Sequence, residues 1–263
     1  MRTLYREKRY FCGDYLEVDM YPVIEYQRGR SKKRKPTTET QQKLNQKNAE
    51  RKLIRLLNTN FTKNDLRFDL TYSDEFYPNS NQDAQREMQN FLRRVKRYRK
   101  KHNLPELKYV AVTEIGKKTA RVHHHIVMNG GVDIFTLAEI WGRGYTTAKP
   151  LQFDEHGIVG IAKYLVKEPI LGKRWCASKN LVQPKETQRD GRVSQRKVKM
   201  FHDSGIDNRE EIEKLYDGYA LAEVVPYYNE INGGYYLTVR MYKKQALKKS
   251  RKRGRNGRQR CDI

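Results

Sequence analysis

The sequence predicts an α+β fold in which an antiparallel sheet carries helices on one face. Short runs of alternating apolar and polar residues indicate strands, and longer segments with apolar residues at helical spacing indicate helices. The two patterns alternate along the middle of the chain. The central strands flank a short polar segment with one Gly, which is typical of a β-hairpin. We therefore expect hairpin-connected strands at the centre of the sheet.

The first part of the chain reads as an extension of this core. Residues 15–26 have the composition of a strand, interrupted by Pro22. Residues 28–35 form a basic arm, which either contacts phosphates or is a solvated linker. From Thr38, apolar residues at helical spacing predict a helix, with Thr38 as its N-cap.

The core elements follow in order. Residues 66–72 alternate apolar and polar side chains and predict a half-buried strand. Residues 83–102 predict a helix with one apolar and one basic face. The basic face either contacts DNA backbone or is simply solvated. A short helix at 135–141 and a strand near 144–151 come after the central hairpin.

The central hairpin, residues 109–129, holds the only clustered metal-ligand chemistry in the sequence. Because side chains alternate across a strand, His123 and His125 share one face while His124 takes the other. A symmetric hairpin places Glu114 opposite His123 on that same face. The sequence therefore predicts a His, His, carboxylate cluster. Three adjacent histidines on a solvated strand edge are the alternative.

The segment 157–168 predicts a helix that presents a tyrosine and a lysine together. Tyr164 and Lys167 are three residues apart and are therefore neighbours on the helix surface. An ordinary amphipathic helix with an interfacial Tyr is the alternative. The expected buried stripe consists of Ile158, Ile161 and Leu165.

The last third of the chain has weaker patterns. Residues 184–210 are polar and predict a loop, and residues 210–219 predict a helix. Two further runs, 220–228 and 234–242, predict a closing pair of strands. Residues 243–263 are rich in Lys and Arg without apolar periodicity, which predicts a disordered basic tail.

Composition indicates the class of partner. The 263 residues include 55 Lys or Arg and 31 Asp or Glu, a formal net charge of +24 that attracts polyanions such as nucleic acid. No apolar run approaches the length of a membrane span, and no signal peptide is evident. Three widely separated cysteines indicate neither a disulfide framework nor a zinc site, which fits a reducing cytoplasm.

Three motifs in this order resemble those of the HUH endonucleases, in particular the rolling-circle replication initiator (Rep) proteins of phages and plasmids. The stretch 68–72 resembles their first motif, 123–125 the second, and 164–167 the third. The second motif departs from the family pattern because its middle residue is His rather than aliphatic. Two-tyrosine initiators carry a further Tyr where this chain has Gly160. The resemblance therefore implies a single-tyrosine enzyme.

The resemblance also implies an activity. It implies a nickase that cuts single-stranded DNA at a rolling-circle origin and rejoins strands by the reverse reaction. Tyr164 would form a 5′-phosphotyrosine link and leave a free 3′-hydroxyl primer, with Lys167 favouring the phenolate. His123, His125 and Glu114 would hold a divalent metal, Mg²⁺ or Mn²⁺.

The resemblance implies an HUH or RRM-like nuclease fold and a location in the cytoplasm of a bacterial host cell. Expected partners are a single-stranded origin hairpin, host helicase and polymerase, and a second protomer for termination. No phosphate-binding loop of a helicase is present. A relaxase, a tyrosine HUH transposase and a non-catalytic DNA-binding protein remain alternatives. Candidate DNA contacts are Thr71, Lys163, Lys173, Arg174 and Trp175. The expected division is an N-terminal extension at 1–61, the nuclease core at 62–183, a C-terminal extension at 184–242 and the tail at 243–263.

Overall fold

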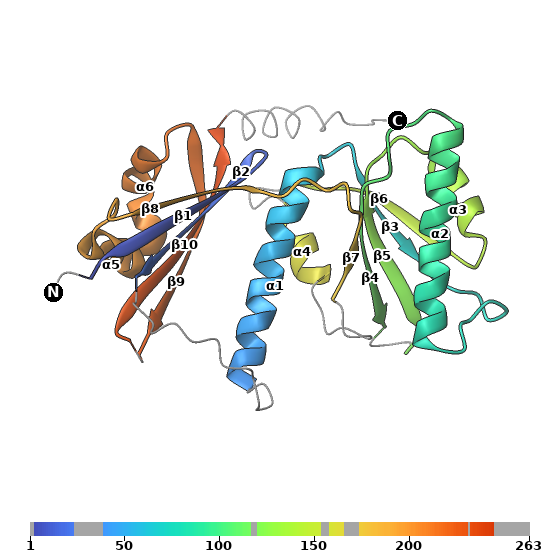
Figure 1. Cartoon of the computed structure of the whole chain (residues 1–263), viewed down its shortest axis with the longest axis horizontal. Coiled ribbons are helices and arrows are strands. Elements are labelled where there is room, and N and C mark those ends of the chain that lie inside the picture. The colour runs from blue at the N-terminus through green and yellow to red at the C-terminus, as the bar shows by residue number, and fades with distance from the viewer. Residues whose placement is uncertain are drawn as a thin grey trace, which may run out of the picture. The chain divides into compact units, whose positions relative to one another are not determined.

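The computed structural model forms two compact units, described separately below (Figure 1). One comprises the N- and C-terminal segments, and the other comprises Gln46–Phe153 and Ile158–Val182. The basic arm at 28–35 and nearly all of the basic tail lie outside the described residues. The structure describes residues 3–23, 39–116, 120–153, 158–165, 174–230 and 232–244.

The unit of the terminal segments is built on a five-stranded antiparallel sheet of order β8-β1-β2-β10-β9. β1 and β2 form a hairpin, and β2 also pairs with β10, so strands from both ends of the chain share one sheet. Apolar side chains of this sheet pack with those of two helices around Val18, Phe201 and Val239. The elements are β1 (Tyr5–Cys12), β2 (Tyr15–Pro22), β8 (Lys185–Asp190), α5 (Gln195–Ser204), η1 (Gly205–Asn208), α6 (Arg209–Leu215), β9 (Tyr219–Asn229) and β10 (Gly234–Lys243).

The prediction of a loop over residues 184–210 is wrong, because this segment contains β8 and α5. β8 pairs with β1 through its backbone, and its side chains are almost all exposed, so it shows no apolar alternation. Charge pairs support the pairing: Arg6 donates to both carboxylate oxygens of Asp190 at 2.8 Å. α5 buries only Val198 and Phe201, too few apolar residues for a clear periodic signal.

The second unit contains a five-stranded antiparallel sheet of order β6-β3-β5-β4-β7. One face of this sheet packs against α2 and α3, around Phe68, Phe91, Ile126 and Trp141. The helix α1 (Glu39–Asn60) enters this unit at Gln46. The other elements are β3 (Leu66–Leu70), α2 (Asn81–Lys101), β4 (Tyr109–Ile115), β5 (Val122–Met128), α3 (Ile134–Trp141), β6 (Thr146–Pro150), α4 (Val159–Leu165) and β7 (Cys176–Ala177).

The two helices that cover this sheet have clear sequence boundaries. Ser80 caps α2 by accepting a hydrogen bond from the backbone N–H of Asp83. Asp133 caps α3 in the same way, and α3 ends at Gly142, whose φ of 57° is a left-handed conformation that favours glycine. Each helix therefore begins and ends where its sequence provides a cap.

The α+β fold class is confirmed, with two antiparallel sheets that carry helices. The predicted elements of the second unit are found within a few residues of their expected limits. Across the described ranges, no helix is both long enough and apolar enough to cross a membrane.

Candidate functional site

The hairpin formed by β4 and β5 positions the three predicted ligands. Glu114 pairs with His123 across the hairpin, which is the register expected from a symmetric turn. Residues of one strand alternate between faces, so His123 and His125 lie together and His124 lies on the opposite face. The structure therefore brings Glu114, His123 and His125 into one cluster.

Both imidazoles point at the same carboxylate oxygen. His123 Nε2 lies 2.8 Å and His125 Nε2 lies 2.9 Å from Oε1 of Glu114. The ligand atoms of the three residues all lie within 4.8 Å of one another. Glu114 and His125 are buried, and His123 is half-buried. Three donor atoms thus converge on one point at the edge of the protein interior.

The second ring nitrogen of each histidine has its own partner. His125 Nδ1 lies 2.6 Å from Oδ1 of Asp69, and His123 Nδ1 lies 3.2 Å from the carbonyl oxygen of Arg121. When Nδ1–H donates to these acceptors, the lone pair of Nε2 faces the cluster. Arg67 donates to Asp69 at 2.8 Å and also lies 3.1 Å from His125 Nδ1. Because Nδ1 cannot donate to Asp69 and accept from Arg67 at once, we assign the shorter bond to the carboxylate.

The ionisation of these groups reflects their pairing. Burial alone would raise the pKa of Asp69, but the hydrogen bonds from His125 and Arg67 hold it below its ordinary value. Burial alone would lower the pKa of His125, but its bonds to Asp69 and Glu114 raise it above the ordinary value. The site is therefore rich in negative charge that favours a cation.

The donor set fits a divalent metal ion. Two neutral imidazole nitrogens and one carboxylate oxygen are common ligands for divalent first-row ions, and their convergence places lone pairs that would repel each other around one position. A carboxylate that orients a ligating histidine is the usual support of such a site, and Asp69 has that geometry. The residues present therefore could hold a metal.

His124 has a structural place on the other face of β5. Its Nε2 lies 2.8 Å from the Tyr72 hydroxyl, and its Nδ1 lies 2.8 Å from the Thr113 hydroxyl. Burial, with the neighbouring histidines His123 and His125, lowers the pKa of His124 to about 3. A neutral, fully hydrogen-bonded imidazole thus packs into the core, which agrees with the strand alternation.

The predicted tyrosine helix is present as α4. Ile158 and Leu165 are buried as expected, but Ile161 is only half-buried, and Val159 and Ala162 take the remaining buried positions. The helix is short, and its buried side therefore lies nearer the small residues than the predicted stripe. Figure 1 shows α4 on the side of the sheet away from α2.

The predicted catalytic side chains lie outside the described residues. Tyr164 and Lys163 belong to the backbone of α4, but the structure describes neither side chain. Lys167 and Lys173 fall within 166–173, which is also outside the described ranges. The roles assigned to these residues from the sequence remain predictions.

Three other candidate DNA contacts are described. The exposed Thr71 donates its hydroxyl to the carbonyl oxygen of Tyr145 at 2.9 Å. Arg174 and Trp175 are half-buried, and Arg174 donates a hydrogen bond to the side chain of Gln46 in α1. Thr71 and Arg174 therefore already make contacts within the protein.

Sequence reasoning missed the residues that support the cluster. Asp69 orients His125, while Tyr72 and Thr113 hold His124. Asp69 and Tyr72 lie within the strand motif 68–72, but no local pattern shows which carboxylate or hydroxyl will face which imidazole. The alternation of β3 provides a usable signal, because Asp69 pairs directly with His125 in the sheet.

The fold and the site define an α+β protein whose sheet carries a candidate metal centre of two imidazoles and one carboxylate. Residues 65–169 match the family of the replication-associated protein ORF2. The match spans β3, the β4–β5 hairpin and α4. This segment is therefore that of a replication-associated protein, and the resemblance to rolling-circle initiators is confirmed over these residues. Comparisons with curated proteins and with solved structures gave no significant match.

Proposed function

We propose that this protein initiates rolling-circle replication by nicking single-stranded DNA at the origin. The observation that carries the proposal is the convergence of His123 and His125 on one oxygen of Glu114, within the segment that matches the replication-associated family. A cation site on a sheet, in a chain of net charge +24, suits a substrate made of phosphodiesters.

The cluster would hold Mg²⁺ or Mn²⁺ through the Nε2 atoms of His123 and His125 and a carboxylate oxygen of Glu114. When bound, such an ion polarises a phosphate and offsets the charge that develops on its oxygens. Asp69 keeps the Nδ1 proton of His125 away from the site and fixes the ring. Arg67 in turn holds Asp69 in place.

Tyr164 would be the nucleophile. Its oxygen would bond to phosphorus while the bond from phosphorus to the 3′-oxygen breaks, giving a 5′-phosphotyrosine and a free 3′-hydroxyl. A phenol with an ordinary pKa near 10 needs a cation nearby to favour its ionised form, and Lys167 would supply one. The new ester retains the energy of the old one, so a 3′-hydroxyl can reverse the reaction and rejoin the strand.

The strand would be held by residues around the cluster and α4. Lys163, Lys173 and Arg174 would contact phosphates, and Trp175 would stack on a base. Thr71 lies two residues beyond Asp69 along the chain and therefore close to the cluster. The free 3′ end would serve host polymerase, a host helicase would separate the strands, and a second protomer would supply the tyrosine that ends the round.

The test is a denaturing gel that detects protein covalently joined to origin DNA. We compare wild type, Tyr164→Phe and His123→Ala, each with Mn²⁺ and with chelator. Only wild type with metal should give a shifted band. His202→Ala and Tyr219→Phe are matched controls in the other unit and should behave as wild type. An adduct that persists in Tyr164→Phe, or none on any origin strand, would contradict the proposal.

A further inference from the structure

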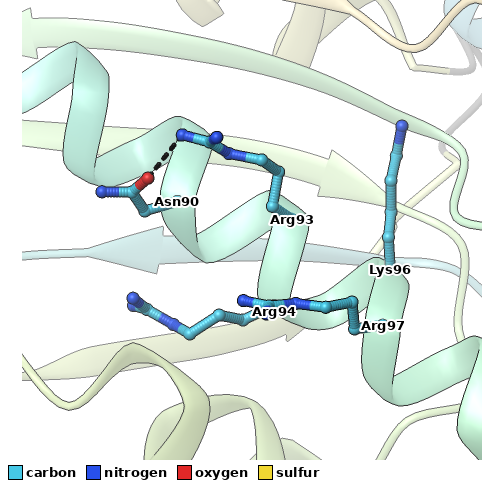
Figure 2. A pocket seen from close by; sticks show the side chains of 5 residues that line it. All are labelled: Asn90, Arg93, Arg94, Lys96 and Arg97. Carbon is cyan, nitrogen blue, oxygen red and sulfur yellow. Dashed lines mark hydrogen bonds between the residues drawn. The ribbon is translucent and has the colours of Figure 1, made fainter.

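The C-terminal half of α2 carries an unusual concentration of positive charge. Residues 90–101 include seven Lys or Arg and no Asp or Glu. A groove of about 480 Å³ lies over this half of the helix. Its lining consists of Asn90, Arg93, Arg94, Lys96 and Arg97 (Figure 2).

Two of the arginines in this basic groove are held in position. Arg93 donates a hydrogen bond to Oδ1 of Asn90 at 2.5 Å, and Figure 2 shows its side chain turned back toward that residue. Arg94 donates to the carbonyl oxygens of Ile140 and Trp141, at 3.0 and 3.3 Å. These are terminal carbonyls of α3, so Arg94 caps that helix. Arg94 therefore has a structural role as well as a charge.

The remaining cations of the groove lack acidic partners. Arg93, Lys96 and Arg97 are exposed, and no carboxylate in the described part of the chain forms an ion pair with them. Arg93 and Arg97 are four residues apart, and like charges at this spacing destabilise a helix by a few tenths of a kcal/mol, about 0.2–0.5. A polyanion over the groove would offset that repulsion. A DNA backbone suits it, because each strand presents a phosphate about every 3.4 Å along the duplex axis.

The basic groove and the His cluster belong to opposite faces of one sheet. The apolar residues of α2 pack on Phe68, Ile126 and Met128, which share the face of His124. His123 and His125 point to the other face. DNA in the groove is therefore a different stretch from the strand at the cluster.

We propose that the basic groove binds the phosphate backbone of origin DNA that flanks the nicked segment. This inference rests on the proposed function, since it concerns the same DNA. Contacts to phosphates fix the position of a nucleic acid without reading its sequence. The groove thus adds affinity and register for long DNA while the cluster acts on a short stretch.

The test uses the variant Arg93→Glu/Arg97→Glu, which leaves Arg94 and its contacts to α3 unchanged. Binding to long origin DNA and to a short oligonucleotide that spans only the nick is measured in chelator, across a range of salt. We expect about tenfold weaker binding to long DNA, with a salt slope shallower by about two, because two phosphate contacts are lost. Affinity for the short oligonucleotide should stay at the wild-type value.

The matched control is Arg86→Glu/Arg196→Glu, which makes the same charge change at exposed arginines outside the groove. Equal loss of affinity in the control would overturn the proposal, because it would show only general electrostatic attraction. Unchanged binding of long DNA by Arg93→Glu/Arg97→Glu, or an equal loss with the short oligonucleotide, would overturn it as well. Thermal melting verifies that both variants fold, and Arg93→Gln/Arg97→Gln should show a smaller loss in the same direction. Because binding is measured without metal, failure of nicking and failure of the groove are told apart.

Discussion

At the scale of single residues, Asp69 decides how His125 faces the candidate metal. Its carboxylate lies 2.6 Å from His125 Nδ1 and is itself held by Arg67. A neutral histidine has one N–H, so an acceptor at Nδ1 leaves Nε2 as the ligand atom. The second-sphere carboxylate thus sets the tautomer as well as the orientation of the ring.

We expect Asp69→Ala to weaken Mn²⁺ binding by about 10- to 100-fold, because the imidazole of His125 loses its orienting partner. Titration calorimetry with Mn²⁺ measures the effect. Asp69→Asn should recover part of the affinity, since an amide oxygen still accepts from Nδ1. Asp74→Ala is the control, because Asp74 is exposed and pairs with Arg121. Equal affinities for Asp69→Ala and wild type would show that Asp69 does not position the ligand.

His124→Ala should reduce the free energy of unfolding by about 3 kcal/mol, from the cavity and from the two buried hydroxyls left without a partner. Urea denaturation measures this loss. Mn²⁺ affinity of the folded protein should remain, because His124 faces Tyr72 and Thr113 rather than the cluster. A variant of normal stability that no longer binds Mn²⁺ would reverse the assignment of the two faces.

At the scale of elements, a buried charged group joins β1 to the end of α6. Arg192 donates to both carboxylate oxygens of Glu7 at 2.9 Å and to the carbonyl oxygen of Leu215. The guanidiniums of Arg9 and Arg192 lie over the ring of Tyr216, 5.0 and 5.5 Å from its centroid. Burial, with the charge of Glu7, raises the pKa of the Tyr216 phenol.

This group predicts how stability changes at high pH. A phenol whose pKa is higher in the folded chain contributes stability that is complete below the unfolded value, near 10, and is lost as the pH rises above it. Wild type should therefore lose about 1 kcal/mol more than Tyr216→Phe between pH 10 and pH 11. Urea denaturation at the two pH values measures the difference. Tyr227→Phe, at an exposed position on β9, should lose as much as wild type.

The elements differ in how well the sequence predicts them. The β4–β5 hairpin was predictable to its register, because alternation and a short turn leave few ways to pair Glu114 with His123. β8 was not, because its pairing depends on backbone bonds and on partners such as Arg6 and Asp190, which are distant in sequence. Local periodicity reports burial on one face, and an exposed edge strand has none to report.

At the scale of the whole molecule, the sequence predicted the centre of the chain better than its ends. The candidate ligands lie within a dozen residues, so local rules were enough to place them. The sheet that unites β1 and β2 with β8, β9 and β10 depends on contacts between the two ends of the chain, which no local pattern encodes. The same limit applies to Asp69, which meets His125 across 56 positions.

Positive charge is distributed through the molecule, so attraction to DNA is general and position must come from particular surfaces. The net charge of +24 gives affinity for any polyanion. The basic groove on α2 and the His cluster on the opposite face would then act on separate stretches of one DNA. Specific placement thus depends on the geometry of the sheet between them.

The location of all three candidate ligands on one hairpin also has a consequence for the order of folding. A hairpin closes in about 1–10 μs, because its contacts are near in sequence and little loop entropy is lost. Glu114, His123 and His125 would therefore meet before β3 joins the sheet. The orienting carboxylate of Asp69 would arrive later, with β3. Loose capture of an ion would thus come first, and the fixed geometry would follow when the sheet is complete.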